Sequence, residues 1–109
     1  MSERKILRHI VMFGFLSDAG EQQVTQVIER FTALKHRVPG IVEFEWGENT
    51  SPEKLNQGHT HCFTLSFDTS EARDVYLNHP IHQEFAQWVG QWVETVTVLD
   101  YWATPVHES

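Results

Sequence analysis

The sequence predicts an α+β domain in which a four-stranded antiparallel sheet carries its helices on one face. Apolar residues recur at strand spacing and then at helical spacing, in the order β-α-β-β-α-β. The first strand is apolar on both of its alternating faces, which is typical of a central strand. The second helical region is interrupted at His79-Pro80. This order of elements is that of the ferredoxin-like arrangement.

The N-terminal part supplies the first strand and the first helix. Residues 6–15 are almost entirely apolar and form the predicted central strand. A helix follows through residue 38, with Asp18 and Glu21 at the spacing of a capping box. Pro39-Gly40 ends this helix.

The middle of the chain supplies two strands joined by a polar loop. Residues 41–46 alternate apolar and acidic side chains, which predicts a half-buried strand. Residues 47–58 are rich in loop-forming residues, and residues 60–67 alternate again. We expect four aromatic residues of these strands to remain on the open face of the sheet: Phe44, Trp46, Phe63 and Phe67. An exposed apolar face of that size predicts a partner, and a homodimer is the simplest one.

The C-terminal part supplies a broken helix and the last strand. The candidate caps for a short helix through Leu77 are Asp68, Thr69 and Ser70. Pro80 suits the first turn of a second helix, and His79 before it is the predicted cap. Residues 93–102 are rich in β-branched side chains and form the predicted fourth strand, followed by a tail.

Composition limits the classes of protein to consider. The 109 residues, 40% of them hydrophobic, are enough for one packed domain over residues 1–109, with a core over about 5–103. The net charge of −7 repels phosphate backbones, so we expect no nucleic acid partner. No apolar run reaches the roughly 20 residues of a membrane span, so no membrane partner is expected. A single cysteine, Cys62, fits a reducing, cytoplasmic location.

The stretch from Tyr76 to His82 concentrates groups that can transfer protons. Imidazole is the side chain that titrates nearest neutral pH, and a tyrosine hydroxyl can bind a substrate oxygen or share a proton. Because His79 is the predicted helix cap, Tyr76 and His82 are the catalytic candidates. A purely structural interpretation stays open for His82, since a histidine at a helix edge often hydrogen-bonds a carbonyl.

Three further side chains could join this site. His9 and His61 lie in predicted neighbouring strands and are either core residues or pocket residues. Arg73 lies one helical turn before Tyr76 and could hold a substrate carboxylate, or could be solvated. Imidazoles can bind zinc, nickel or copper, and four are candidates: His59, His61, His79 and His82. No carboxylate joins them at ligand-like spacing, so we expect no metal site.

Several motifs together resemble those of the stress-responsive dimeric α/β-barrel (Dabb) family. They span about residues 5–103 and are Arg8–Phe13, Val38-Pro39-Gly40, Trp46-Gly47, Thr60-His61, Tyr76–His82 and Leu99-Asp100-Tyr101. The resemblance implies a dimeric α+β barrel, in which two sheets close face to face around a small-molecule pocket in each chain. It also implies that no cofactor is needed.

The resemblance extends to the candidate site residues. The family includes a plant cyclase that closes a linear polyketide by an aldol condensation, and its acid/base pair matches His82 and Tyr76. The match also implies that His9 and His61 contact the substrate. We expect Arg73 and an apolar wall to complete the substrate-binding site, the wall being Val11, Phe13, Val27, Phe31, Phe63 and Leu65.

The favoured function is therefore a cofactor-independent acid/base enzyme of the cyclase or aldol type. Its ligand would be a small apolar or carbonyl-containing molecule, with His82 as base and Tyr76 orienting the imidazole and a substrate oxygen. Two alternatives stay open. One is a non-catalytic stress or ligand-binding dimer, and the other is a cofactor-free oxygenase acting on aromatic substrates.

Overall fold

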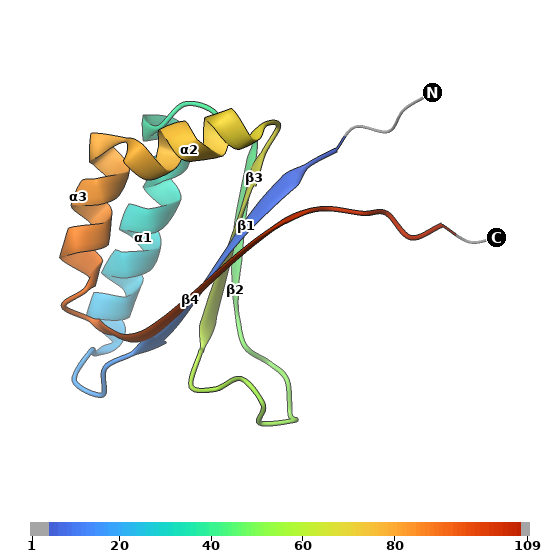
Figure 1. The fold of residues 1–109 in the computed structure, drawn as a ribbon. Helices are drawn as coiled ribbons and strands as arrows, with labels where there is room; N and C mark the ends of the chain where they lie inside the picture. Colours follow the sequence, from blue (N-terminus) through green and yellow to red (C-terminus); the bar gives the residue numbers. More distant parts are fainter. Residues whose placement is uncertain (1–4, 108–109) are drawn as a thin grey trace.

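The computed structural model describes residues 5–107, which form a four-stranded antiparallel sheet with three helices on one face (Figure 1). The elements are β1 (Leu7–Phe15), α1 (Glu21–Arg37), β2 (Glu43–Glu48), β3 (His61–Phe67), α2 (Ser70–Asn78), α3 (Pro80–Val89) and β4 (Val93–Trp102). The strand order is β2-β3-β1-β4, so β1 is central as predicted. The α+β, ferredoxin-like fold is confirmed.

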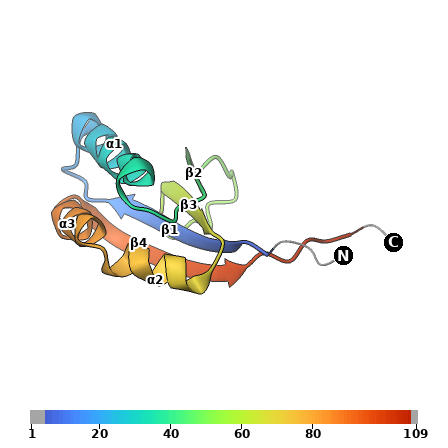
Figure 2. The same cartoon turned by 90° about the horizontal axis from the view of Figure 1, so that it is seen from above.

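The helices are arranged so that α2 crosses the sheet at a different angle from the other two. Figure 1 shows α1 and α3 running alongside each other, with α2 lying across their upper end. Figure 2 shows the same pair from above, with the start of β1 and the end of β4 on the side away from α1 and α3. None of the helices described here is long and apolar enough to cross a lipid bilayer.

The pairing of β1 with its two neighbours decides which side chains face the helices. His9, Val11 and Phe13 alternate along β1 and point to the same side. Their direct partners share that side, and these are Leu65, Phe63 and His61 on β3 and Asp100, Val98 and Val96 on β4. The helix-covered face therefore combines an apolar core with His9, His61 and the carboxylate of Asp100.

The core is centred on aromatic rings between α1 and this face. Phe31 of α1 lies 4.5 Å from Phe63 and 4.8 Å from Phe85, measured between ring centroids. Phe63 is completely buried, and Phe13 and Phe31 are almost so. Burying each such side chain stabilises the fold by about 1.5–3 kcal/mol, which fixes α1 and α3 against the sheet.

The open face of the sheet carries other residues than those predicted. Phe63 and Phe67 are fully buried beneath the helices, Phe44 packs on Phe31, and Trp46 pairs with Phe63 on that same side. The prediction that these aromatic residues remain on the open face was therefore wrong. That face instead carries Ile10, Met12, Thr64, Thr97, Leu99 and Tyr101. It is still partly apolar, since Leu99 is 57% and Tyr101 47% exposed.

Two helix starts test the capping predictions. The cap of α1 is Gly20, whose amide donates a 3.0 Å hydrogen bond to the side chain of Gln23, so the predicted Asp18–Glu21 box is wrong. A tight turn between Leu16 and Ala19 places Asp18 before the helix begins. The cap of α2 is Thr69, one of the three candidates, whose hydroxyl accepts from the amide of Ala72 at 3.0 Å.

Candidate functional site

A cavity of about 430 Å³ lies between the sheet and the helices α2 and α3. Its wall is mostly apolar, with a few converging polar groups, which is the composition expected of a small-molecule site. The apolar part includes Val11, Phe13, Phe31, Phe85, Val89, Val93, Val96 and Val98. The polar side chains are His9, Tyr76, His82, Glu94 and Asp100.

The break between α2 and α3 is built by His79 and Pro80. Pro80 occupies the first turn of α3, where its missing amide hydrogen costs nothing. His79 caps this helix, because its Nδ1 accepts a 3.1 Å hydrogen bond from the amide of Ile81. The predicted capping role of His79 is confirmed.

This break also determines the protonation pattern of His82. In a continuous helix the amide of Ile81 would donate to the carbonyl of Leu77, but here it donates to His79. The carbonyl of Leu77 instead lies 3.0 Å from Nδ1 of His82. A carbonyl can only accept, so Nδ1 carries the proton, and in the neutral ring Nε2 keeps its lone pair. His82 is thereby prepared to act as a base through Nε2.

Burial keeps His82 in this neutral form near pH 7. Loss of solvent lowers the pKa of His82 from its ordinary 6.5, and this effect exceeds the opposite effect of the Leu77 hydrogen bond. The nearby ring of His9 lowers the pKa further.

Tyr76 lies directly beside His82 in the cavity wall and carries a hydroxyl that lacks a partner among the described residues. Their ring centroids are 4.4 Å apart, and the tyrosine is completely buried. Among the described residues its hydroxyl has no hydrogen-bond partner, which is unusual for a buried polar group. Burial raises the pKa of Tyr76 well above its ordinary value of 10.0, so the phenol stays protonated and can donate.

His9 is oriented by Asp100, which is in turn paired with Arg73. Its Nδ1 lies 2.8 Å from one carboxylate oxygen of Asp100, and Nη1 of Arg73 donates to the other oxygen at 2.8 Å. Arg73 also donates from Nε to Asp74 at 2.9 Å, and these bonds raise the pKa of Arg73. With its Nδ1 on a carboxylate, His9 can present Nε2 to the cavity, as a histidine oriented by an aspartate does in acyl transfer.

Asp100 is the site residue that the sequence analysis did not identify. It pairs directly with His9 across β1 and β4, although 91 positions separate the two in the chain. Its place after Leu99 at the end of an alternating strand was visible in the sequence. Only the register of the two strands puts its carboxylate against the imidazole.

The structure places His61 apart from this cavity. It pairs with Phe13, four residues along β1 from His9, which corresponds to a separation of about 13 Å. There its ring stacks on Trp46, and its Nδ1 lies 2.8 Å from the hydroxyl of Thr60. Burial lowers the pKa of His61, despite the opposite effect of Glu48. His61 lines a different hollow of about 540 Å³, bordered by the loop after β2.

The remaining predicted substrate contacts divide into two groups. Val11, Phe13 and Phe31 line the cavity. Three fully buried core residues do not line it: Val27, Phe63 and Leu65. Arg73 lies behind Asp100 and is not part of the lining either.

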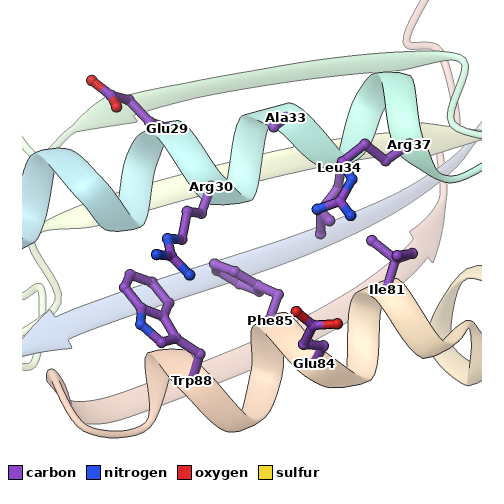
Figure 3. Close-up of a pocket in the computed structure, with 9 residues that line it drawn as sticks. All are labelled: Glu29, Arg30, Ala33, Leu34, Arg37, Ile81, Glu84, Phe85 and Trp88. Atoms are coloured by element: carbon purple, nitrogen blue, oxygen red, sulfur yellow. The ribbon is translucent and has the colours of Figure 1, made fainter.

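A separate groove of about 400 Å³ runs between α1 and α3 (Figure 3). Arg30 reaches across it to Trp88, with its guanidinium carbon 4.2 Å from the ring centroid. Phe85 lines both this groove and the cavity, so it forms a partition between them. The groove contains no histidine and no tyrosine among the residues that line it, and we assign it no chemistry.

The four histidines considered for a metal do not converge. His59 hydrogen-bonds Asn56 and Thr97, while His79 caps α3 and His82 bonds Leu77. Within residues 5–107 no group of three or more histidine, cysteine, aspartate or glutamate residues is arranged to hold a metal ion.

Comparisons with known proteins match nearly the whole chain. A family model described as the stress responsive A/B barrel domain (Dabb) matches residues 7–103. The chain is 31% identical over 100 residues to the stress-response A/B barrel domain-containing protein HS1 of Arabidopsis thaliana, covering 92% of each chain. It is 22% identical to the olivetolic acid cyclase of Cannabis sativa, covering 87% of this chain and 94% of the cyclase.

Solved structures of the same fold were also found. A hydroxynitrile lyase from Passiflora edulis superposes with a TM-score of 0.88 at 26% identity, covering 97% of this chain and 100% of the lyase. Several more distant structures are described as dimeric ferredoxin-like proteins of unknown function.

Proposed function

We propose that this chain, which belongs to the stress-responsive A/B barrel domain (Dabb) family, is an acid/base enzyme acting on a small carbonyl-containing molecule. One observation carries the proposal. A buried imidazole whose Nδ1 is bound to the Leu77 carbonyl lies beside a buried tyrosine hydroxyl that lacks a partner. A base with a free lone pair and a donor in need of an acceptor together fit a substrate with an acidic proton and an oxygen.

The proposed reaction begins with proton transfer to Nε2 of His82. For an aldol-type substrate this proton comes from the carbon next to a carbonyl, and Tyr76 donates a hydrogen bond to the developing enolate oxygen. The enolate carbon then attacks a second carbonyl, and the resulting alkoxide takes a proton from His82 or His9. For a hydroxynitrile, His82 takes the hydroxyl proton, the bond to the nitrile carbon breaks, and cyanide leaves as the aldehyde forms.

His9 supplies the second proton-handling position in this scheme. Asp100 stabilises the positive charge that the His9 ring gains when Nε2 takes a proton, and Arg73 holds Asp100 in place. His82 has no carboxylate partner among the described residues and so remains the base. Such a positioned base contributes about 10²–10⁴-fold to a rate.

The relatives support this class of chemistry. Their names include a cyclase, which closes a ring, and a hydroxynitrile lyase, which cleaves a hydroxynitrile. Because identity to either is below 30%, the substrate of this chain is proposed by class.

The test uses two substrates that release an aldehyde detectable by ultraviolet absorbance or by fluorescence: mandelonitrile and a fluorogenic β-hydroxyketone, respectively. We expect the wild-type protein to cleave at least one, and His82→Gln and Tyr76→Phe to lose about 10²-fold in kcat/KM. The exposed His36→Gln on α1 is the matched control and should retain activity. Turnover that survives both cavity substitutions would refute the proposed mechanism.

We also propose that the chain acts as a cytoplasmic homodimer. The open face of the sheet supports the dimer, since Ile10 pairs with Leu99 there and Leu99 is 57% exposed. A second copy packed on this face would bury these side chains and close the two sheets into a barrel. Solution mass at micromolar concentration tests it directly.

A further inference from the structure

We infer that the cavity selects an uncharged ligand and rejects carboxylates and phosphates, because the nearby arginine is committed to Asp100 and the lining carries only acidic formal charges. The inference rests on the proposed function, since it concerns the same cavity and names the class of molecule that it accepts. It replaces the expectation that Arg73 holds a substrate carboxylate.

The charged side chains that line the cavity are all acidic. Among the residues that the structure describes, no lysine and no arginine lines the cavity, whereas Glu94 and Asp100 do. An anionic ligand would therefore meet the exposed carboxylate of Glu94 and that of Asp100, which is paired with Arg73, and no free cation. Like charges brought together in a partly desolvated site repel strongly.

Arg73, the arginine beside Asp100, is already paired with two acidic side chains. Its guanidinium donates to Asp100 at 2.8 Å and to Asp74 at 2.9 Å, and its side chain is 22% exposed. Hydrogen bonds between charged partners are about twice as strong as neutral ones. To reach an anion in the cavity, Arg73 would have to leave Asp100, which would then face the same anion unpaired.

The histidines do not provide an alternative anion site. Where His9 carries a second proton, Asp100 already lies 2.8 Å from its Nδ1 and serves as the counter-ion. His82 is kept neutral near pH 7 by burial. Tyr76 remains protonated and offers a hydrogen to an oxygen acceptor.

The groups in the cavity wall suit a neutral molecule that has both a hydrogen-bond acceptor and an acidic hydrogen. Tyr76 can donate to a carbonyl, and Nε2 of His82 can accept from a hydroxyl or an acidic C–H. The rest of the wall is apolar, including Val96 and Val98 of β4. β-Hydroxyketones and hydroxynitriles have this pattern, whereas free organic acids and phosphate esters are anionic at neutral pH.

The test compares benzamide with benzoate, which have nearly the same shape and differ in charge. Binding to the full-length protein is followed by NMR, with shifts of the Tyr76 and His82 side chains identifying the cavity. We expect benzamide to bind about tenfold or more tightly than benzoate to the wild type at neutral pH. Equal or tighter binding of benzoate would overturn the inference while leaving the proposed acid/base chemistry intact.

Two variants and one control separate the charge effect from general damage. Asp100→Asn removes the negative charge and releases Arg73, so the preference for benzamide should shrink to about twofold or reverse. Arg73→Gln leaves Asp100 unpaired and should increase the preference. Asp74→Asn keeps the bond between Arg73 and Asp100 and should leave the ratio unchanged. If neither probe reaches the cavity at millimolar concentration, both the inference and the proposed function fail.

Discussion

Replacing Tyr76 by phenylalanine should raise stability and lower activity at the same time. The change removes one hydroxyl and keeps the ring, which is completely buried against Phe67, His9 and His82. The hydroxyl lacks a hydrogen-bond partner among the described residues, so the folded protein bears the cost of burying it.

The magnitude follows from the burial of that hydroxyl. An unsatisfied buried polar group costs about 1–3 kcal/mol. The adjoining cavity of about 430 Å³ is large enough to admit water, which recovers part of this cost. We therefore expect the free energy of unfolding to rise by about 1 kcal/mol, which raises Tm by roughly 4 °C in a domain of this size. Losing one donor to a developing oxyanion should lower kcat/KM by about 10²-fold.

Chemical denaturation measures the first quantity, and the aldehyde-release assay measures the second. His36→Gln is again the control, because His36 is exposed on α1, and it should change stability by less than about 0.5 kcal/mol. A Tyr76→Phe protein destabilised by more than about 1 kcal/mol would show that the hydroxyl has a structural partner. Unchanged kcat/KM would show that it has no catalytic role.

Five further outcomes are expected. Because burial lowers the pKa of His82 below 6.5, kcat/KM should fall only at a pH below this value. The same group binds more protons in the unfolded chain, so the free energy of unfolding should be constant above about pH 6.5 and decrease as pH falls below it, as pH-dependent denaturation would show. Asp100→Asn should change the imidazole ¹⁵N shifts of His9, because its Nδ1–H loses the carboxylate. His79→Ala should lower stability by about 1 kcal/mol through loss of the α3 cap. Leu99→Glu on the open face should convert the dimer to a monomer in light-scattering measurements.

Three of these outcomes have a control or a contrary result. The pH effect on stability should be smaller in His82→Gln and unchanged in His36→Gln; an equal response in both variants would assign it to other groups. Unaltered His9 shifts in Asp100→Asn would show that the carboxylate does not hold the ring. For the open face, Val75→Glu is the comparison, since Val75 is 53% exposed on α2, away from the sheet. A monomer produced by Val75→Glu as well would argue against the sheet as the interface.

The order of elements could be predicted from the sequence because each segment buries one periodic face. The last strand, Val93–Trp102, was predicted with the bounds that the structure has, since its β-branched alternation ends at the tail. His79 was identified as a cap because it precedes a proline at a helix start, a strictly local relation. The cap of α1 was missed, because Asp18 fits the composition of a cap while the chain still turns there.

The faces of β2 and β3 could not be predicted, for a physical reason. Alternation shows which side chains share a face but not which face the helices cover. Phe63 and Phe67 belong together on one side, yet only the position of α1 shows that this side is the core. The register of β1 and β3 could not be predicted either. It places His61 opposite Phe13, so His61 and His9 share a face but lie far apart on it.

The candidate site was predictable where the chain itself brings groups together. Tyr76 and His82 meet because one broken helical region carries both. Asp100 could not be assigned, because its partner His9 is 91 positions away and their contact depends on the pairing of two distant strands. Arg73 was noticed as a cation near Tyr76, but its commitment to Asp100 depends on that same pairing.

The hydrogen bond between the carbonyl of Leu77 and His82 could be lost through a single substitution at the helix break. Closing the break between α2 and α3 would return that oxygen to the amide of Ile81, and a better helix former than Pro80 would promote the change. His82 would then lose the bond that dictates which nitrogen carries its hydrogen. Pro80→Ala would permit this change, and selection for turnover would remove it. Descendants that no longer need the reaction should be recognisable by an uninterrupted helix here.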